Sequence, residues 1–294
     1  MKTREGSIDI EDGELDLKLS MECGQTFLWN KLSGKPLHED TPCKKFYKVL
    51  KDNIVILWQD SGKLYYRGSV GKKKIIDLLN LDVDLKKVEK MVSMDHTIVK
   101  AFQKFRGLRI LNDEFFPCLI SYIISAQTQI PRIKFIVDIL SERYGSCLNF
   151  GDNIYNKFPT PLELSKATLG ELKEIGLGYR AKYVKTATDQ IVNSDIDEEY
   201  LKNLSYPEAK GELKKLMGVG DKVADCVLLF SLGFDQSYPL DTWGKKVIRE
   251  VYPDFYDTRY WKVSENMRNY FGKYAGWAHE YLFHWARENR EIFG

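Results

Sequence analysis

The stretch Leu216-Met-Gly-Val-Gly-Asp-Lys222-Val-Ala-Asp-Cys226 places a glycine turn directly before an apolar helix. Glycine permits a positive φ and the close approach of another backbone. The first amides of the following helix point out of its N-terminus, where the helix dipole favours an anion. We therefore predict that the backbone of Gly218, Val219 and Gly220 binds a phosphate, with a plain corner between two helices as the alternative.

Lys222 interrupts the apolar pattern of this helix, which we expect to run to Leu232 with Asp221 as its N-cap. Partial burial and the positive end of the helix both disfavour an ammonium group there, and an uncharged amine is a nucleophile. Cys226 lies one turn further along the same face. An exposed lysine that only binds phosphate is the competing interpretation.

Asp241 follows Lys222 by 19 residues and precedes a helix that we expect to start near Gly244. Its position is that of an N-cap, and capping alone is one interpretation. A carboxylate held there can also stabilise a developing positive charge and steer protons for the amine. The two residues together favour an enzyme over a purely phosphate-binding turn.

The chain of 294 residues is 44% hydrophobic and 29% charged, which is typical of a globular protein with room for more than one domain. Its net charge of +2 gives no global basic field, so binding to nucleic acid would require a local patch. The charged residues 2–5 are followed by no apolar segment, and no run reaches membrane-spanning length. We predict an intracellular protein of the cytoplasm or nucleoid, without membrane contact.

The cysteines and histidines are scattered and show no metal-ligand spacing. An odd number of cysteines without a C-x-x-C pair argues against a disulfide framework, structural zinc and an iron–sulfur cluster. We therefore expect a reduced protein that requires neither metal nor cofactor. The residues concerned are Cys23, Cys43, Cys118, Cys147, Cys226, His38, His96, His279 and His284.

Residues 1 to about 70 favour a mostly antiparallel sheet, because short β-type runs alternate with turn signals. Turns are predicted at Ser33-Gly34, Lys51-Asp-Asn53 and Asp60-Ser-Gly62. The predicted strands are Leu15–Leu19, Thr26–Trp29, Phe46–Leu50, Ile54–Trp58 and Leu64–Arg67.

From about residue 72 the hydrophobic period becomes helical. Phe115–Ala126 is apolar nearly all round, as expected of a buried central helix. The fold class is therefore α+β, with an antiparallel sheet followed by a multi-helix core. Other helices are predicted at Ile75–Leu79, Leu85–Val92, His96–Phe105 and Ile130–Tyr144, and a further series begins at Pro159-Thr-Pro161.

A second Gly-x-Gly turn between helices, within Leu172–Arg180, echoes the one within Leu213–Lys222. With Lys222 and Asp241 in place, the chain resembles the helix–hairpin–helix DNA glycosylases, and among them the 8-oxoguanine DNA glycosylase/AP lyases. The resemblance runs in order over almost the whole chain. The matching segments are Cys23–Trp29 (CGQTFLW), Leu81–Asp84 (LDVD), Phe105–Arg109 (FRGLR), Gly176–Tyr183 (GLGYRAKY) and Tyr274–Phe283 (YAGWAHEYLF).

We accordingly expect an N-terminal antiparallel α+β domain at residues 1–92 and a helical glycosylase core at residues 93–294. The helix–hairpin–helix would lie near residues 206–232. The expected partner is double-stranded DNA that contains oxidised guanine, bound by a monomer.

The resemblance implies a base-flipping mechanism, because C1′ of a paired nucleotide is out of reach inside a duplex. Lys222 would attack C1′, release the oxidised guanine and leave a Schiff base. Elimination of the 3′ phosphate would then nick the strand, with Asp241 positioning and stabilising this chemistry. No metal is required, although the backbone of Leu216 and Val219 is a possible cation site.

The resemblance also implies a pocket for the flipped base. The Gly24 carbonyl would accept the N7–H that distinguishes 8-oxoguanine from guanine. Phe283 would stack on one face of the base, and Cys226 would approach the other. His279 replaces a glutamine that would read the Watson–Crick edge, so base preference depends on its protonation state.

On the opposite strand, Gln127, Arg132 and Arg180 match residues that hydrogen-bond the orphaned cytosine, and Tyr179 matches a wedge in the base stack. Cytosine suits arginine because its O2 and N3 are acceptors and guanidinium offers only donors. Without the resemblance, helix capping and solvent exposure would explain Gln127 and Arg132.

The sequence departs from the animal and fungal members of the family at the opposite-base contact and behind the active site. Gln127-Thr-Gln129 stands where they have three asparagines. Trp243 replaces a histidine two residues after the aspartate, and Ala286 replaces an aspartate associated with that histidine. Two other functions therefore stay open: a glycosylase of the same fold for another damaged base, and a non-catalytic helix–hairpin–helix DNA-binding protein.

Overall fold

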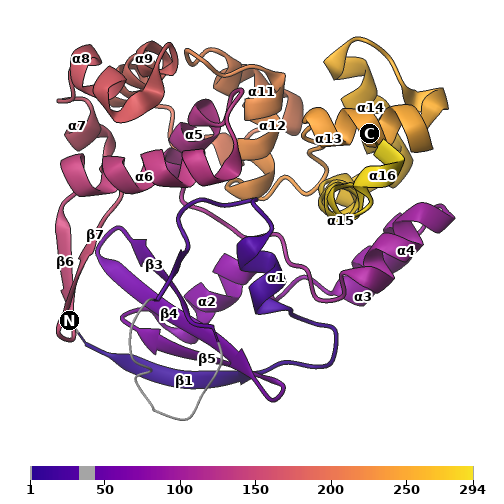
Figure 1. Ribbon diagram of the computed structural model, residues 1–294, viewed down its shortest axis with the longest axis horizontal. Coiled ribbons are helices and arrows are strands. Elements are labelled where there is room, and N and C mark those ends of the chain that lie inside the picture. The colour runs from indigo at the N-terminus through magenta and orange to yellow at the C-terminus, as the bar shows by residue number, and fades with distance from the viewer. Residues whose placement is uncertain (1, 33–43, 294) are drawn as a thin grey trace.

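A five-stranded antiparallel sheet forms the N-terminal part of the protein in our computed structural model, which describes residues 2–32 and 44–293 (Figure 1). Its order is β1-β5-β4-β3-β2. The predicted turns at residues 51–53 and 60–62 are confirmed, whereas Ser33-Gly34, His38 and Cys43 lie outside the described residues. The strands are β1 (Arg4–Asp9), β2 (Asn30–Lys31), β3 (Phe46–Leu50), β4 (Asn53–Asp60) and β5 (Lys63–Gly68).

Two predicted strands are wrong. Leu15–Leu19 runs into helix α1 (Leu17–Glu22), because the Asp16 side chain accepts a hydrogen bond from the Leu19 amide at 2.8 Å and caps this helix. Thr26–Trp29 is a buried connection and not a strand, with β2 starting directly after it. Strand β1 was not predicted, since Ile8 is its one buried residue and it shows no alternation of burial.

A second small sheet, the β6–β7 hairpin (Cys147–Phe150 and Asn153–Asn156), also went unpredicted. Figure 1 shows it descending from the helical part alongside the first sheet. Its Leu148, Phe150 and Tyr155 pack with Ile54 and Ile56 of β4. This packing joins residues nearly a hundred positions apart, which the local pattern of either segment does not reveal.

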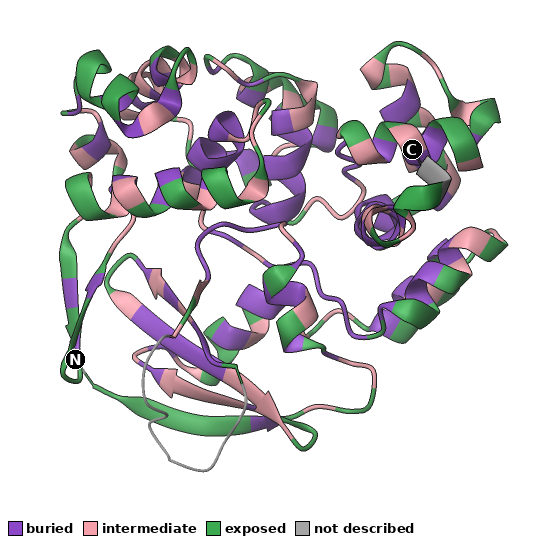
Figure 2. Cartoon of the chain, viewed as in Figure 1, coloured by how far each residue is buried: buried purple, intermediate pink, exposed green. Residues whose placement is uncertain are grey.

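The remainder of the described chain is helical, and its centre is the most buried part of the molecule (Figure 2). The predicted helix Phe115–Ala126 corresponds to α5 (Phe115–Ile124), which is buried on nearly all sides. The helices before the Gly-x-Gly turn at residues 176–178 and into it are α2 (Lys72–Leu79), α3 (Leu85–Val92), α4 (His96–Lys104), α5, α6 (Ile130–Tyr144), α7 (Pro161–Leu164), α8 (Leu169–Leu172) and the π-helix η1 (Lys173–Leu177). They are followed by α9 (Arg180–Val192), α10 (Glu198–Lys202), α11 (Tyr206–Lys214), α12 (Asp221–Phe230), α13 (Thr242–Val251), α14 (Tyr260–Phe271), α15 (Ala275–Glu288) and α16 (Arg290–Phe293), with short 3₁₀ turns η2 (Pro253–Phe255) and η3 (Gly272–Tyr274).

Helix α15 packs against both early and late parts of the chain. It contacts α4 as extensively as it contacts α13, and it also contacts α3. The side chains of Val88 and Val92 on α3 accordingly belong to the same hydrophobic core as Trp277 and Tyr281 on α15. The boundary between two domains at residue 92 stays a prediction.

A buried ion pair ties the sheet to the helical core. Lys48 of β3 donates to Asp113, and the Thr26 hydroxyl donates to the second carboxylate oxygen at 2.6 Å. The Asp113 amide donates to the carbonyl of Phe230 at the end of α12, at 2.7 Å. The side chains of both charged residues are almost fully buried.

Lys48→Met is expected to destabilise the protein by about 3–5 kcal/mol, because it leaves the Asp113 carboxylate buried and unpaired. Urea denaturation measures this loss of unfolding free energy. The control is Lys86→Met, which breaks an exposed pair with Glu11 and should cost less than about 1 kcal/mol. Equal effects of the two substitutions would contradict a structural role for the buried pair.

Candidate active site

The turn between α11 and α12 has the predicted positive φ at one of its two glycines, Gly218. Gly218 has φ +84°, and a Cβ there would lie 2.7 Å from Cβ of Tyr183, so the position requires glycine. Gly220 is extended, and a Cβ on it would meet no protein atom within 4 Å. The backbone at Gly220 therefore faces open space, as a phosphate-binding turn requires.

Asp221 is not the N-cap of α12, as we had predicted, but its first helical residue, and Gly220 occupies the cap position. The backbone of Gly220 is extended, as at a cap, and the Asp221 carboxylate pairs with Lys214 of α11 at 2.8 Å. The possible cation site at Leu216 and Val219 stays a prediction, and the Leu216 carbonyl accepts from the Val219 amide at 3.1 Å.

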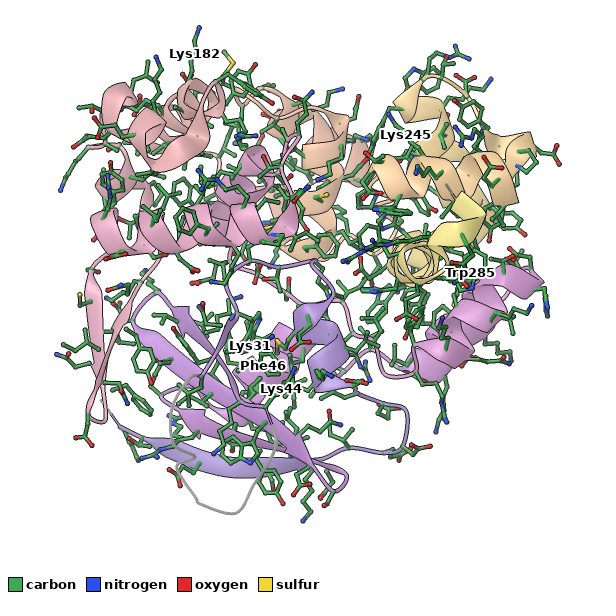
Figure 3. The ribbon with its side chains drawn as sticks, viewed as in Figure 1. Lys31, Lys44, Phe46, Lys182, Lys245 and Trp285 are labelled. Atoms are coloured by element: carbon green, nitrogen blue, oxygen red, sulfur yellow. The ribbon has the colours of Figure 1, made fainter. Side chains whose placement is uncertain are left out.

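A cleft of about 1070 Å³ opens where the α5–α6 connection, α12, the start of α13, α15 and the loop after α1 converge. Its lining includes most of the residues singled out by sequence, among them Lys222, Asp241, Gly24, Cys226, His279, Phe283 and Gln127. Figure 3 places the exposed Lys245 on the helical part, and its side chain lines the same cleft.

Lys222 is half-buried in the cleft wall, and α5 holds its side chain in place. Its Nζ donates to the Ser125 hydroxyl at 3.1 Å and lies 4.9 Å from the ring centroid of Tyr122. The Ser125 hydroxyl thus orients the amine, and the Tyr122 ring presents its face to it. The amine is held on the cleft side of α12.

Asp241 caps α13, as predicted, with the helix starting at Thr242. Its carboxylate accepts from the Gly244 amide at 2.6 Å. Burial raises the pKa of this carboxyl, while the Gly244 amide and the charge of Lys222 act in the opposite direction. Asp241 is thus a carboxylate held rigidly near an amine in a poorly solvated wall.

Gly24, Phe283 and Cys226 all line the cleft. Gly24 has φ +98°, and a Cβ there would lie 2.5 Å from Cδ1 of Ile130, so again only glycine fits. Burial raises the pKa of the Cys226 thiol to about 12, so this thiol is neutral at ordinary pH. The ring of Phe283 is flanked by the Arg287 guanidinium, 5.3 Å from the ring centroid.

His279 lies buried beside this pocket and is uncharged. Burial lowers its pKa to about 3, and the charge of Lys222 contributes to the shift. Its ring stacks on Phe283, with centroids 6.1 Å apart. Both ring nitrogens are buried and neither has a hydrogen-bond partner within the described part of the chain, so one donor and one acceptor of the neutral ring are unpaired.

Of the residues assigned to the opposite strand, Gln127 lines the cleft, and Tyr179 and Arg180 are bonded to the segment that carries it. Arg180 donates to the Ala126 carbonyl at 2.7 Å and to the Thr128 hydroxyl. The Tyr179 hydroxyl donates to the Gln127 side chain at 3.4 Å, and Tyr179 is 53% exposed. Arg132 lies on the adjoining exposed surface of α6, with its guanidinium over the Phe135 ring at 4.9 Å.

Two family profiles cover most of the chain. The profile of the 8-oxoguanine DNA glycosylase N-terminal domain matches residues 7–119, and that of the HhH-GPD superfamily base excision DNA repair proteins matches residues 120–271. The chain belongs to the HhH-GPD superfamily. This family membership agrees with the hairpin, the cleft and the capping aspartate described above.

Individual members of the superfamily are similar over nearly their full length. An N-glycosylase/DNA lyase of Saccharomyces cerevisiae is 30% identical, covering 96% of this chain and 86% of its own. A probable N-glycosylase/DNA lyase of Methanothermobacter thermautotrophicus is 26% identical, covering 95% and 96%. The Clostridium acetobutylicum 8-oxoguanine glycosylase/lyase, solved with double-stranded DNA containing cytosine opposite 8-oxoguanine, is 32% identical with a TM-score of 0.84, covering 94% of this chain and 93% of that one.

Two of the positions at which the sequence departs from the animal and fungal family members are Trp243 and Ala286. Trp243 places its ring under two cations, with Lys246 at 5.0 Å and Arg290 at 5.8 Å from the ring centroid. Ala286 is fully buried in the α15 face of the core. A cation–aromatic cluster thus stands where the sequence lacks the expected polar pair.

Sequence reasoning missed two contacts of the site. Ser125 holds Lys222 from α5, and no spacing relates these two residues. Arg287 donates to the Cys23 carbonyl at 2.8 Å and so fixes the loop that carries Gly24. The position of Arg287, one helical turn after Phe283, could have indicated that it faces the site.

Lowering the pH is expected to slow catalysis through Asp241. Because the pKa of its carboxyl is raised, the group gains a proton as pH falls through a value above the ordinary aspartate pKa of about 3.9. The neutral acid cannot stabilise positive charge. Single-turnover rates on a damaged duplex, measured against pH, should decline on the acid side while DNA binding persists; rates constant down to about pH 4 would contradict this.

Proposed function

We propose that this protein is a base-excision repair enzyme that removes 8-oxoguanine, preferably opposite cytosine, from double-stranded DNA and then cleaves the strand as an AP lyase. The observation that carries the proposal is the presence of Lys222 and Asp241 on the wall of one cleft with the Gly24 backbone. Family membership supplies the reaction class, and the similarity to the Clostridium acetobutylicum enzyme supports the lesion.

We assign the chemistry to the two charged residues. The Lys222 amine attacks C1′ of a nucleotide turned out of the duplex, and the bond from C1′ to the base breaks as the base departs with a proton. Opening of the sugar ring leaves an iminium at Lys222, and loss of a C2′ proton expels the 3′ phosphate. Asp241 stabilises the positive charge that develops at C1′ and accepts or returns protons.

We assign base recognition to the pocket around Gly24. The Gly24 carbonyl is an acceptor for N7–H, which guanine lacks. Phe283 offers an aromatic face, and Cys226 contacts the opposite face as a neutral thiol. The neutral His279 supplies a donor and an acceptor for the Watson–Crick edge. Gly218, Val219 and Gly220 hold the backbone phosphate.

A lesion panel tests the proposal directly. Duplexes containing 8-oxoguanine, an alkylated purine, an oxidised pyrimidine or normal guanine are incubated with the protein, with and without borohydride. Excision and a trapped covalent complex are expected with 8-oxoguanine. Preferential excision of another lesion would support a different specificity on the same fold, and binding without excision of any lesion would support a non-catalytic DNA-binding protein.

Discrimination among opposite bases is expected to be modest, within about 10–100-fold. Each correct contact to a base is worth about 1–3 kcal/mol, and the exposed Gln127 has a longer and more adaptable side chain than asparagine. Single-turnover excision of 8-oxoguanine against cytosine, adenine, guanine and thymine measures the ratio. An absolute requirement for cytosine would contradict the assignment.

The described helices include none with the length and apolar character needed to cross a membrane. We propose that the protein acts where chromosomal DNA is accessible, in the cytoplasm or nucleoid.

A further inference from the structure

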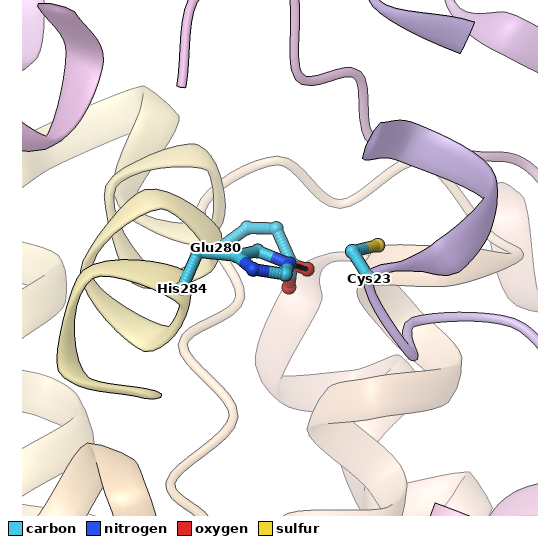
Figure 4. A group of neighbouring side chains, drawn as sticks. All are labelled: Cys23, Glu280 and His284. Atoms are coloured by element: carbon cyan, nitrogen blue, oxygen red, sulfur yellow. Dashed lines mark ion pairs between the residues drawn. The ribbon is translucent and has the colours of Figure 1, made fainter. Parts of the chain in front are cut away.

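Cys23, Glu280 and His284 form a buried cluster in the wall of the cleft, which Glu280 itself lines (Figure 4). One potential ligand atom from each residue lies within 4.8 Å of the other two. Their exposed fractions are 1%, 3% and 7%. Figure 4 shows Glu280 and His284 projecting from α15 towards Cys23 at the end of α1. The excision chemistry proposed above uses none of these side chains.

Two polar atoms of this cluster have no hydrogen-bond partner among the described residues. Glu280 Oε1 and His284 Nε2 make no hydrogen bond to residues 2–32 or 44–293, and they lie 3.6 Å from each other. A buried polar atom left without a partner costs free energy, so such atoms are uncommon in native proteins. An ion between the two side chains would satisfy both.

We propose that Cys23, Glu280 and His284 bind a zinc ion. A thiolate, an imidazole and a carboxylate are ligands that zinc takes, whereas magnesium and calcium prefer oxygen alone. The negative charges of the thiolate and the carboxylate balance the double charge of the ion. On binding, the Cys23 thiol releases its proton to solvent, and a water molecule completes four-coordination.

The cluster lies between two hollows. One, of about 540 Å³, is lined by Cys23 and His284, whereas Glu280 lines the cleft, and Arg287 borders both spaces. An entry path is one requirement of a protein metal site. The ion would therefore reach Cys23 and His284 through the smaller hollow, and Glu280 would hold it from the side of the cleft.

A metal ion bound at this site would link two segments that line the cleft. Cys23 directly precedes Gly24, while Glu280 and His284 flank Phe283 on α15. A bound ion would tie the loop that carries Gly24 to the helix that carries Phe283, in addition to the hydrogen bond from Arg287. The expectation of a metal-free protein came from ligand spacing, which cannot reveal ligands from opposite ends of the chain.

Cobalt binding to the metal-free full-length protein tests the proposal. One Co²⁺ per chain is expected, with a sulfur-to-cobalt charge-transfer absorption that Zn²⁺ abolishes on addition. Cys23→Ser should remove this absorption. His284→Gln should weaken affinity at least about 100-fold, since loss of an outer-shell partner alone costs about 10–100-fold. The matched control is Cys147→Ser on the exposed β6, which should leave the absorption and the affinity unchanged.

Three outcomes would overturn the proposal: absence of a sulfur–cobalt band at one equivalent, persistence of the band in Cys23→Ser, or its loss in Cys147→Ser. Glu280→Gln is a second, nearly isosteric variant, should Cys23→Ser fail to fold. Zinc should also raise the thermal midpoint of the wild type but not of His284→Gln. None of these measurements uses DNA, so they stand independently of the proposed glycosylase activity.

Discussion

Borohydride is expected to trap the wild-type protein on an 8-oxoguanine duplex and to trap none of the Lys222→Gln variant. Glutamine is polar and only one atom shorter than lysine but has no nucleophilic amine, so no Schiff base forms for the reagent to reduce. Excision should fall by at least about 10⁴-fold, as is typical when a nucleophile is removed. Denaturing gels measure the trapped complex, and single-turnover assays measure excision.

Lys245→Gln is the matched control, because Lys245 lines the same cleft and this substitution removes the same positive charge. It should retain the trapped complex. Binding of Lys222→Gln to an uncleavable duplex should persist, since the turn at residues 218–220 is unchanged. A Lys222→Gln variant that still excises and nicks would assign the nucleophile elsewhere, and one that no longer binds DNA would favour the phosphate-binding interpretation of this lysine.

The elements predictable from sequence were those whose signals are local. Helix α3 was predicted with its observed bounds, because its apolar residues recur at helical spacing, and the structure adds an Asp84 cap at its start. The Asp241 cap was recognised for the same reason. The strand predicted at Leu15–Leu19 failed because the helical spacing of the buried residues Leu17, Ser20 and Met21 extends beyond that segment, and the Asp16 cap was overlooked.

Contacts between distant segments were beyond sequence reasoning. Asp221 was predicted as an N-cap from its residue type and position, yet it is the first helical residue, and its carboxylate pairs with Lys214 on the preceding helix. Ser125 and Arg287 position Lys222 and the Gly24 loop from other elements. The protonation state of His279 was likewise open, because it depends on burial that no local pattern encodes. Residue types and spacing predicted the chemistry of the cleft, and tertiary packing determines its geometry.

Asp241→Asn is expected to reduce excision by about 10²–10³-fold while leaving the fold intact, the size of effect seen when one preorganised electrostatic contact is lost. Asparagine ranks with aspartate as an N-cap, so its side-chain oxygen can still accept from the Gly244 amide. The substitution therefore removes the charge and keeps the cap. Single-turnover excision and urea denaturation, measured on the same preparation, separate the two roles.

The direction of the stability change follows from the raised pKa of Asp241. Between the ordinary and the raised value the folded protein holds more protons than the unfolded chain, so stability falls as pH rises through this window. At neutral pH the ionised carboxylate therefore lowers stability, and asparagine should leave it equal or higher. Asp241→Ala, which also loses the cap, should lose about 1 kcal/mol relative to Asp241→Asn. Full excision by Asp241→Asn would show that Asp241 only caps α13. Unfolding of that variant would show that the fold requires the charge of Asp241.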